Sequence, residues 1–71
     1  MITRIGLVAG DIWNYLDEHD RSAELERLVA DLGQERDLVL MSIGWLAREG
    51  HVVLEGESPS QKVRLSSHRK N

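Results

Sequence analysis

The stretch RDLVLMSIGWLAREG, residues 36–50, decides how the rest of the chain is interpreted. It is the most apolar helical segment of the sequence, and Gly50 is placed to end it. A periodic segment and a tight turn precede it, and two short alternating segments follow it. This order predicts an α+β fold, a winged helix-turn-helix of three helices and a C-terminal β-hairpin wing, with residues 36–49 as the recognition helix.

The size and composition of the chain limit its class. It has 71 residues and no cysteine, which predicts one small domain, residues 1–66, and excludes a disulfide or a Cys-based zinc site. Domains this small commonly gain stability by oligomerising. No apolar run is long enough to cross a bilayer and no signal-peptide pattern is visible, so a cytoplasmic location is the default expectation.

Charge is spread unevenly over a chain whose formal net charge is −3. Residues 1–35 hold three arginines against eight carboxylates, which gives −5, and residues 36–71 hold six cations against four carboxylates, which gives +2. A dedicated DNA-binding domain usually shows a clear basic face. Here the distinctly basic part is the C-terminal end, where residues 67–71 form a short basic tail that we expect to be disordered.

Helical spacing predicts a first helix from Thr3, as its N-cap, to about His19. Its buried stripe consists of Ile5, Val8, Ala9, Ile12, Tyr15 and Leu16. Gly6, Gly10 and Trp13 lie together on one flank of that stripe, which predicts a groove where another backbone or ring comes close. Two interpretations of the groove stay open: packing on the wing strands of the same chain, or a contact between subunits.

Residues 17–20, Asp-Glu-His-Asp, resemble a metal site at first sight. Neighbouring residues on a helix point in different directions, and no second histidine is placed to complete the site, so a solvated helix end is favoured. His19, His51 and His68 are scattered along the chain, without a nucleophile motif or a phosphate-binding loop. We therefore expect no enzymatic activity, no metal, no cofactor and no small-molecule ligand.

The next segment predicts the helix-turn-helix. Arg21 and Ser22 form either a short first strand or the segment that caps a second helix, with Ser22 as the N-cap. Gly33 is predicted to end that helix in a left-handed conformation, before a short turn at residues 34–35. The core stripe of the second helix consists of Leu25, Leu28, Val29 and Leu32.

The third helix is apolar on two sides. Its inner face is predicted to contain Val39, Ile43, Leu46 and Ala47, with Leu40 at the edge. The opposite arc carries Asp37, Leu38, Met41, Gly44, Trp45, Arg48 and Glu49. Leu38, Met41 and Trp45 form an apolar ridge with a charged rim, which is typical of a protein interface. The ridge could be covered by the wing or N-terminal segment of the same chain, by a second copy, or by another protein.

Residues 51–55 and 61–66 alternate as two strands, and residues 56–60 have the composition of the loop that joins them. This hairpin is the predicted wing. Its inward side chains are predicted to be Val52, Leu54, Val63 and Leu65.

Two motifs carry a family resemblance: IGLVAGDIWNYL at residues 5–16 and MSIGWLARE at residues 41–49. They resemble the first and third helices of a family of small bacterial winged helix-turn-helix domains of unassigned function, and the resemblance extends over residues 2–65. It implies a stand-alone winged helix, a homodimer, and a place among DNA-binding folds by shape. It brings no catalytic residue and no ligand. His51 stands where a lysine is expected at the entrance to the wing, which removes one cation from a phosphate contact there.

Two functions follow from these features. The first is a regulator-like DNA-binding or transcription-associated domain, acting as a weakly binding homodimer through Arg36, Arg48, Lys62 and Arg64. The alternative is a protein–protein interaction module without intrinsic DNA binding, whose candidate interface residues are Leu38, Met41, Trp45, Gly6, Gly10 and Trp13. Fold precedent favours the first function, and the apolar outer arc favours the second. The acids Asp37, Glu49, Glu55 and Glu57 reduce the expected affinity for phosphates.

Overall fold

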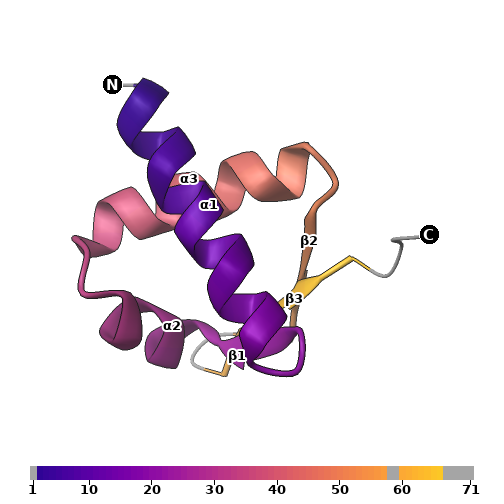
Figure 1. Ribbon diagram of the computed structural model, residues 1–71. Helices are drawn as coiled ribbons and strands as arrows, with labels where there is room; N and C mark the ends of the chain where they lie inside the picture. The colour runs from indigo at the N-terminus through magenta and orange to yellow at the C-terminus, as the bar shows by residue number, and fades with distance from the viewer. Residues whose placement is uncertain (1, 58–59, 67–71) are drawn as a thin grey trace.

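The computed structural model describes residues 2–57 and 60–66. The elements follow in the order α1 (Ile2–Glu18), β1 (Ser22–Glu24), α2 (Leu25–Leu32), α3 (Arg36–Arg48), β2 (Val52–Glu55) and β3 (Lys62–Leu65). Three helices with an antiparallel sheet confirm the predicted α+β winged helix-turn-helix. In Figure 1, α1 crosses α3, and α2 and the sheet lie toward the C-terminal end of α1. The predicted basic tail, 67–71, lies outside the described residues.

Helix α1 is longer at its start than the sequence predicts. It already includes Ile2, so Thr3 lies inside the helix, and the prediction that Thr3 is the N-cap is wrong. After Glu18 the amides of His19 and Arg21 both donate to the carbonyl of Leu16, at 3.1 and 2.8 Å. The chain then passes through two left-handed residues, Asp20 and Arg21, with φ of 61° and 69°. This tight turn sends the chain directly into the sheet.

The segment after this turn is a strand and not a helix cap. Ser22 begins β1, and α2 starts three residues later with Glu24 in the cap position, so the N-cap prediction for Ser22 is wrong and the strand alternative is correct. The reason is pairing: Ser22 and Glu24 lie opposite Arg64 and Lys62 of β3. The backbone of β1 is therefore paired with β3, a strand distant in sequence, and does not form a side-chain cap for α2. Gly33 has φ 70° and ends α2 as predicted.

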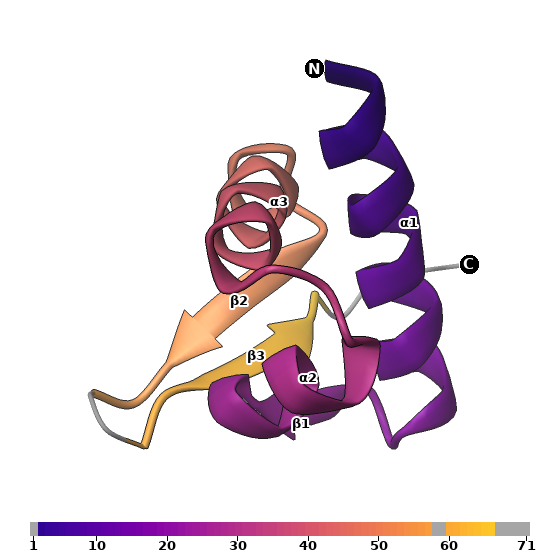
Figure 2. The ribbon, with the colours of Figure 1, turned by 90° about the vertical axis from the view of Figure 1, so that its left-hand side faces the viewer.

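The sheet has the strand order β1-β3-β2, so the last strand lies in the middle. Val63 and Leu65 of β3 are buried under the helices, and Val52 of β2 joins them. Leu54 is 45% exposed, and the prediction that it packs inward is wrong. It lies in β2, an edge strand of the sheet, and the β2–β3 hairpin extends beyond α3 in Figure 2.

The core lies where α1, α3 and the sheet meet. Its largest fully buried apolar side chains come from every layer: Ile12, Leu16, Leu28, Val39, Val63 and Leu65. Each side chain of this kind contributes about 1.5–3 kcal/mol relative to an exposed one. This packing fixes which face of α3 is available to a partner.

Candidate functional site

The outward part of α3 differs from the predicted arc at one position. Met41 and Trp45 are 51% and 39% exposed, as expected for an outer face, but Leu38 is only 6% exposed. The prediction that Leu38 belongs to an exposed ridge is therefore wrong. The buried residues of α3 include Leu38 and Ser42 as well as Val39, Ile43 and Leu46.

Ser42 is a core residue that the sequence analysis did not identify. Its side chain is completely buried, and its hydroxyl donates to the carbonyl of Leu38 over 2.8 Å. The bond satisfies the hydroxyl inside its own helix, as is common for serine. Its place one turn from both Leu38 and Leu46 is the only signal in the sequence that could have indicated its burial.

Trp45 covers the first glycine of α1. A Cβ atom built on Gly6 would lie 3.9 Å from Cζ3 of the Trp45 ring, so an aromatic ring does approach this flank of α1. The ring comes from α3 of the same chain and not from the wing strands. The indole Nε1 donates to a carboxylate oxygen of Glu49 over 3.1 Å. Gly10 has no neighbour within 4 Å of a built Cβ, and Trp13 remains partly exposed.

Two hollows share Trp45 and Glu49 in their lining. One, of about 360 Å³, is lined by Ile5, Met41, Trp45, Arg48 and Glu49. The other, of about 300 Å³, is lined by Gly6, Ala9, Trp45, Leu46, Glu49 and His51. Both hollows are lined by residues of α1 and α3, and each combines apolar side chains with the carboxylate of Glu49, which suits a side chain of a partner protein better than a phosphate.

Arg36, the first candidate DNA contact, is bound within the chain. Its two terminal nitrogens donate to the two carboxylate oxygens of Glu26 in α2, at 2.7 and 2.9 Å. These hydrogen bonds lower the pKa of Glu26 and raise the pKa of Arg36. A bidentate pair of this kind fixes the guanidinium, and a phosphate would have to displace the carboxylate.

The wing cations are also balanced by carboxylates. Arg64 contacts Glu55 through Nε and a terminal nitrogen, each at 2.9 Å. Lys62 is the cross-strand partner of Glu24 on one side and of Glu55 on the other. The exposed face of the sheet therefore carries two cations and two carboxylates, with little net attraction for a nucleic acid backbone.

Arg48 differs from Arg36 and Arg64. It lies exposed in the last turn of α3 and, like Lys62, makes no ion pair within residues 2–57 and 60–66. Arg36 begins the same helix twelve residues earlier, which is about 18 Å away along the axis. The candidate cations thus occupy the two ends of α3 and the sheet, and do not converge on one site.

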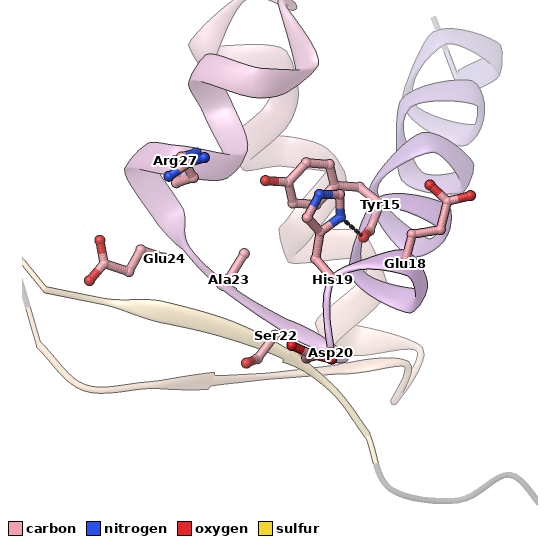
Figure 3. A pocket seen from close by; sticks show the side chains of 8 residues that line it. All are labelled: Tyr15, Glu18, His19, Asp20, Ser22, Ala23, Glu24 and Arg27. Carbon is pink, nitrogen blue, oxygen red and sulfur yellow. Dashed lines mark hydrogen bonds between the residues drawn. The ribbon is translucent and has the colours of Figure 1, made fainter.

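The hollow at the C-terminal end of α1 is polar, has a volume of about 440 Å³ and is shown in Figure 3. The Tyr15 hydroxyl donates to Asp31 over 2.6 Å, which raises the pKa of Tyr15 and lowers the pKa of Asp31. The His19 ring stacks on Tyr15 at 3.9 Å, and its Nδ1 lies 2.7 Å from the Tyr15 carbonyl oxygen.

The carboxylates of Glu18 in α1 and Glu24 in β1 point away from each other in Figure 3. Among the described residues, no group of three His, Cys, Asp or Glu side chains could hold a metal ion. No helix in the described part of the chain is long and apolar enough to cross a membrane.

Comparison with solved structures supports the fold. A structure of protein BT2368 from Bacteroides thetaiotaomicron has a TM-score of 0.75 at 27% identity, covering 89% of this chain and 76% of that one. A structure of HOP2, from work on its DNA recognition and protein interaction domains, has a TM-score of 0.73, covering 83% of this chain and 98% of that one. The identity to HOP2 is 21%, so this likeness shows a shared fold.

Comparison of sequences supports the family. The uncharacterised protein MJ1608 of Methanocaldococcus jannaschii is 30% identical over 63 residues, which are 87% of this chain and 90% of that protein. The model of the winged helix-turn-helix domain family DUF2582 matches residues 1–65, and its description names no catalytic activity. These matches confirm the resemblance that the motifs of α1 and α3 indicate, and the chain belongs to the winged helix-turn-helix domain family DUF2582.

Proposed function

We propose that this chain is a non-catalytic winged-helix domain that binds another polypeptide through the outer face of α3. One observation carries the proposal. The large side chains exposed where this fold reads DNA are mainly apolar, and two of the four candidate cations are neutralised by carboxylates of the same chain. Reading base edges requires Arg, Lys, Asn or Gln on that face. This chain presents Leu40, Met41 and Trp45 there, beside the arginine Arg48.

The surroundings of Met41 and Trp45 agree with this function. The two side chains line one hollow with Ile5, and Arg48 and Glu49 lie at its rim. Tryptophan and methionine are enriched in protein interfaces, and a charged rim gives such interfaces their specificity. A partner side chain in this hollow would contact apolar atoms of both α1 and α3.

A second candidate function is weak binding of duplex DNA by a homodimer. The likeness to HOP2, whose described domains include one for DNA recognition, favours it. In this case Arg48 and Lys62 would supply the first contacts, and Arg36 and Arg64 would have to leave their carboxylate partners. Each phosphate neutralised adds about 0.9 to the salt slope, so the affinity should fall steeply with salt.

A site-specific cross-link separates the two functions. A photoreactive residue placed at Met41 should form adducts with polypeptide in cells, and the same residue at exposed Asn14 of α1 serves as the control. Adducts with nucleic acid at Met41, or equal adducts at both positions, would overturn the proposal. In vitro, a labelled duplex titrated at low and moderate salt should show no saturable binding at micromolar protein.

A further inference from the structure

The outer face of α3 has a regular order of side chains. Asp37, Met41, Gly44 and Arg48 recur at steps of four, three and four residues, so they lie in one line along the helix. All four are exposed, and we name them the outer stripe. Figure 2 shows α3 nearly end-on, with α1 on one flank and the sheet below, and the remaining flank open.

The outer stripe is symmetric about the point between Ser42 and Ile43. A two-fold axis through that point, perpendicular to the helix, exchanges Asp37 with Arg48 and Met41 with Gly44. Leu40 and Trp45, which are 38% and 39% exposed, lie on opposite flanks of the stripe. Asp37 and Arg48 are complementary in charge, and Met41 and Gly44 are complementary in size. A surface with this property matches a second copy of itself, as an isologous interface requires.

The steric match is between Met41 and Gly44. A Cβ built on Gly44 would meet nothing within 4 Å, so the helix has an open notch at this position. Met41 is long, flexible and half exposed. In an antiparallel pair, Met41 of each copy lies over Gly44 of the partner subunit, and the absent side chain lets the helices approach closely.

The charge match is between Asp37 and Arg48. Within residues 2–57 and 60–66, neither makes an ion pair. Antiparallel pairing places Asp37 of each copy beside Arg48 of the partner subunit, at both ends of the contact. Parallel pairing would instead bring like charges together, so the charges select the antiparallel arrangement.

We propose that a second copy of this chain occupies the outer stripe, forming an antiparallel α3–α3 homodimer with Met41 in the Gly44 notch. The inference rests on the proposed protein-binding function and names the partner. A single-helix contact of this size forms a small and reversible interface. Pairing of this kind also covers the helix that would otherwise enter the major groove.

The first experiment fills the notch. Gly44→Gln adds a side chain in open space on α3, and Gly10→Gln is its matched control, because Gly10 is an equally open helical glycine of α1. Sedimentation velocity from about 1 µM to about 1 mM should show reversible dimerisation of the wild type and of Gly10→Gln. Gly44→Gln should weaken dimerisation at least about tenfold, with an unchanged circular dichroism spectrum.

The second experiment exchanges charges. Asp37→Arg and Arg48→Asp should each weaken self-association by about tenfold, because each places like charges together at both ends of the contact. An equimolar mixture of the two variants should pair as a heterodimer at least as tightly as the wild type. A parallel pair predicts no weakening by either variant alone, because like charges already meet at both ends of a parallel wild-type pair.

The outcomes that overturn the pairing differ from those that overturn the proposed function. A wild type that stays monomeric at about 1 mM, dimerisation lost in Gly10→Gln but kept in Gly44→Gln, or no rescue on mixing would each overturn the pairing. None of these touches the cross-link from Met41 to polypeptide, which tests the function. Tight duplex binding that Arg48→Gln abolishes would overturn both.

Discussion

The two faces of α3 are both apolar, but one is buried in the fold and the other is exposed to solvent. On the inner face, Val39, Ile43 and Leu46 are at most 7% exposed, while on the outer face Met41 is half exposed. The difference lies in what stands opposite each face: α1 and the sheet on one side, and open space on the other. Apolar character alone therefore does not say whether a helix face serves stability or binding.

The largest expected effect comes from the inner face. Ile43→Ala should lower the free energy of unfolding by about 2–4 kcal/mol, because it leaves a cavity in a closely packed core. Met41→Ala, its outer-face control, should cost less than about 1 kcal/mol. Urea unfolding of the dilute protein, followed by circular dichroism, measures both. Equal losses would mean that the outer face is also part of the monomer core.

The boundary between the two faces is set by Trp45 over Gly6. Gly6→Ala should be tolerated, because the new Cβ lies at an ordinary contact distance of 3.9 Å from the ring. Gly6→Leu should displace the ring and cost about 1–3 kcal/mol. In a Trp13→Phe background, the fluorescence of Trp45 should shift to the red for Leu and not for Ala. An unchanged spectrum with Leu would contradict this packing.

The start of α3 adds a pH-dependent effect. The hydrogen bonds from Arg36 lower the pKa of Glu26 below its ordinary value of 4.5 in the folded state. This contribution to stability is present above pH 4.5 and is lost as the pH falls through the lower folded pKa. Between pH 7 and about 3, Glu26→Gln should therefore show a smaller fall in melting temperature than the wild type. Glu18→Gln is the control, because Glu18 is exposed and its side chain makes no hydrogen bond or ion pair with the part of the chain that the structure describes.

The smallest expected effect is at Ser42. Ser42→Ala removes a hydroxyl that donates to a carbonyl already bonded within the helix, so no buried donor loses its partner. The stability should change by less than about 1 kcal/mol, helped by the higher helix propensity of alanine. A larger loss in urea unfolding would indicate that the hydroxyl orients α3 against α1.

Local patterns were sufficient for most of the fold. The order of the helices, the turn at Gly33 and the hairpin follow from spacing and turn residues that lie close in sequence. The strand at Ser22 could be offered only as an alternative, because its pairing partner Arg64 lies far along the chain. The N-cap prediction for Thr3 is wrong because α1 begins at Ile2, before the residue with the best capping side chain.

The candidate site was harder to predict than the fold. Helical periodicity predicts the exposed apolar positions Met41 and Trp45 of the outer arc, but it wrongly includes Leu38. Periodicity within one helix does not tell which of two apolar faces is buried, because that depends on how the other elements pack against it. The ion pair of Arg36 with Glu26 joins two helices and has no local signal. That α3 binds a polypeptide, and that Arg48 could meet DNA, remain predictions.

The position of β3 between β1 and β2 has a consequence for how the chain folds. The central strand, β3, is synthesised after β1 and β2. Because β1 and β2 are not paired with each other in the sheet, β3 must insert between them. Before β3 is in place, Ile12 and Leu16 lack the Val63 and Leu65 side chains that complete their core. Closing the long loop between β1 and β3 also costs conformational entropy, and the helices formed from local contacts do not offset this cost. Folding should therefore be all-or-none, with the amides of α1 and β3 gaining protection from hydrogen exchange at the same moment.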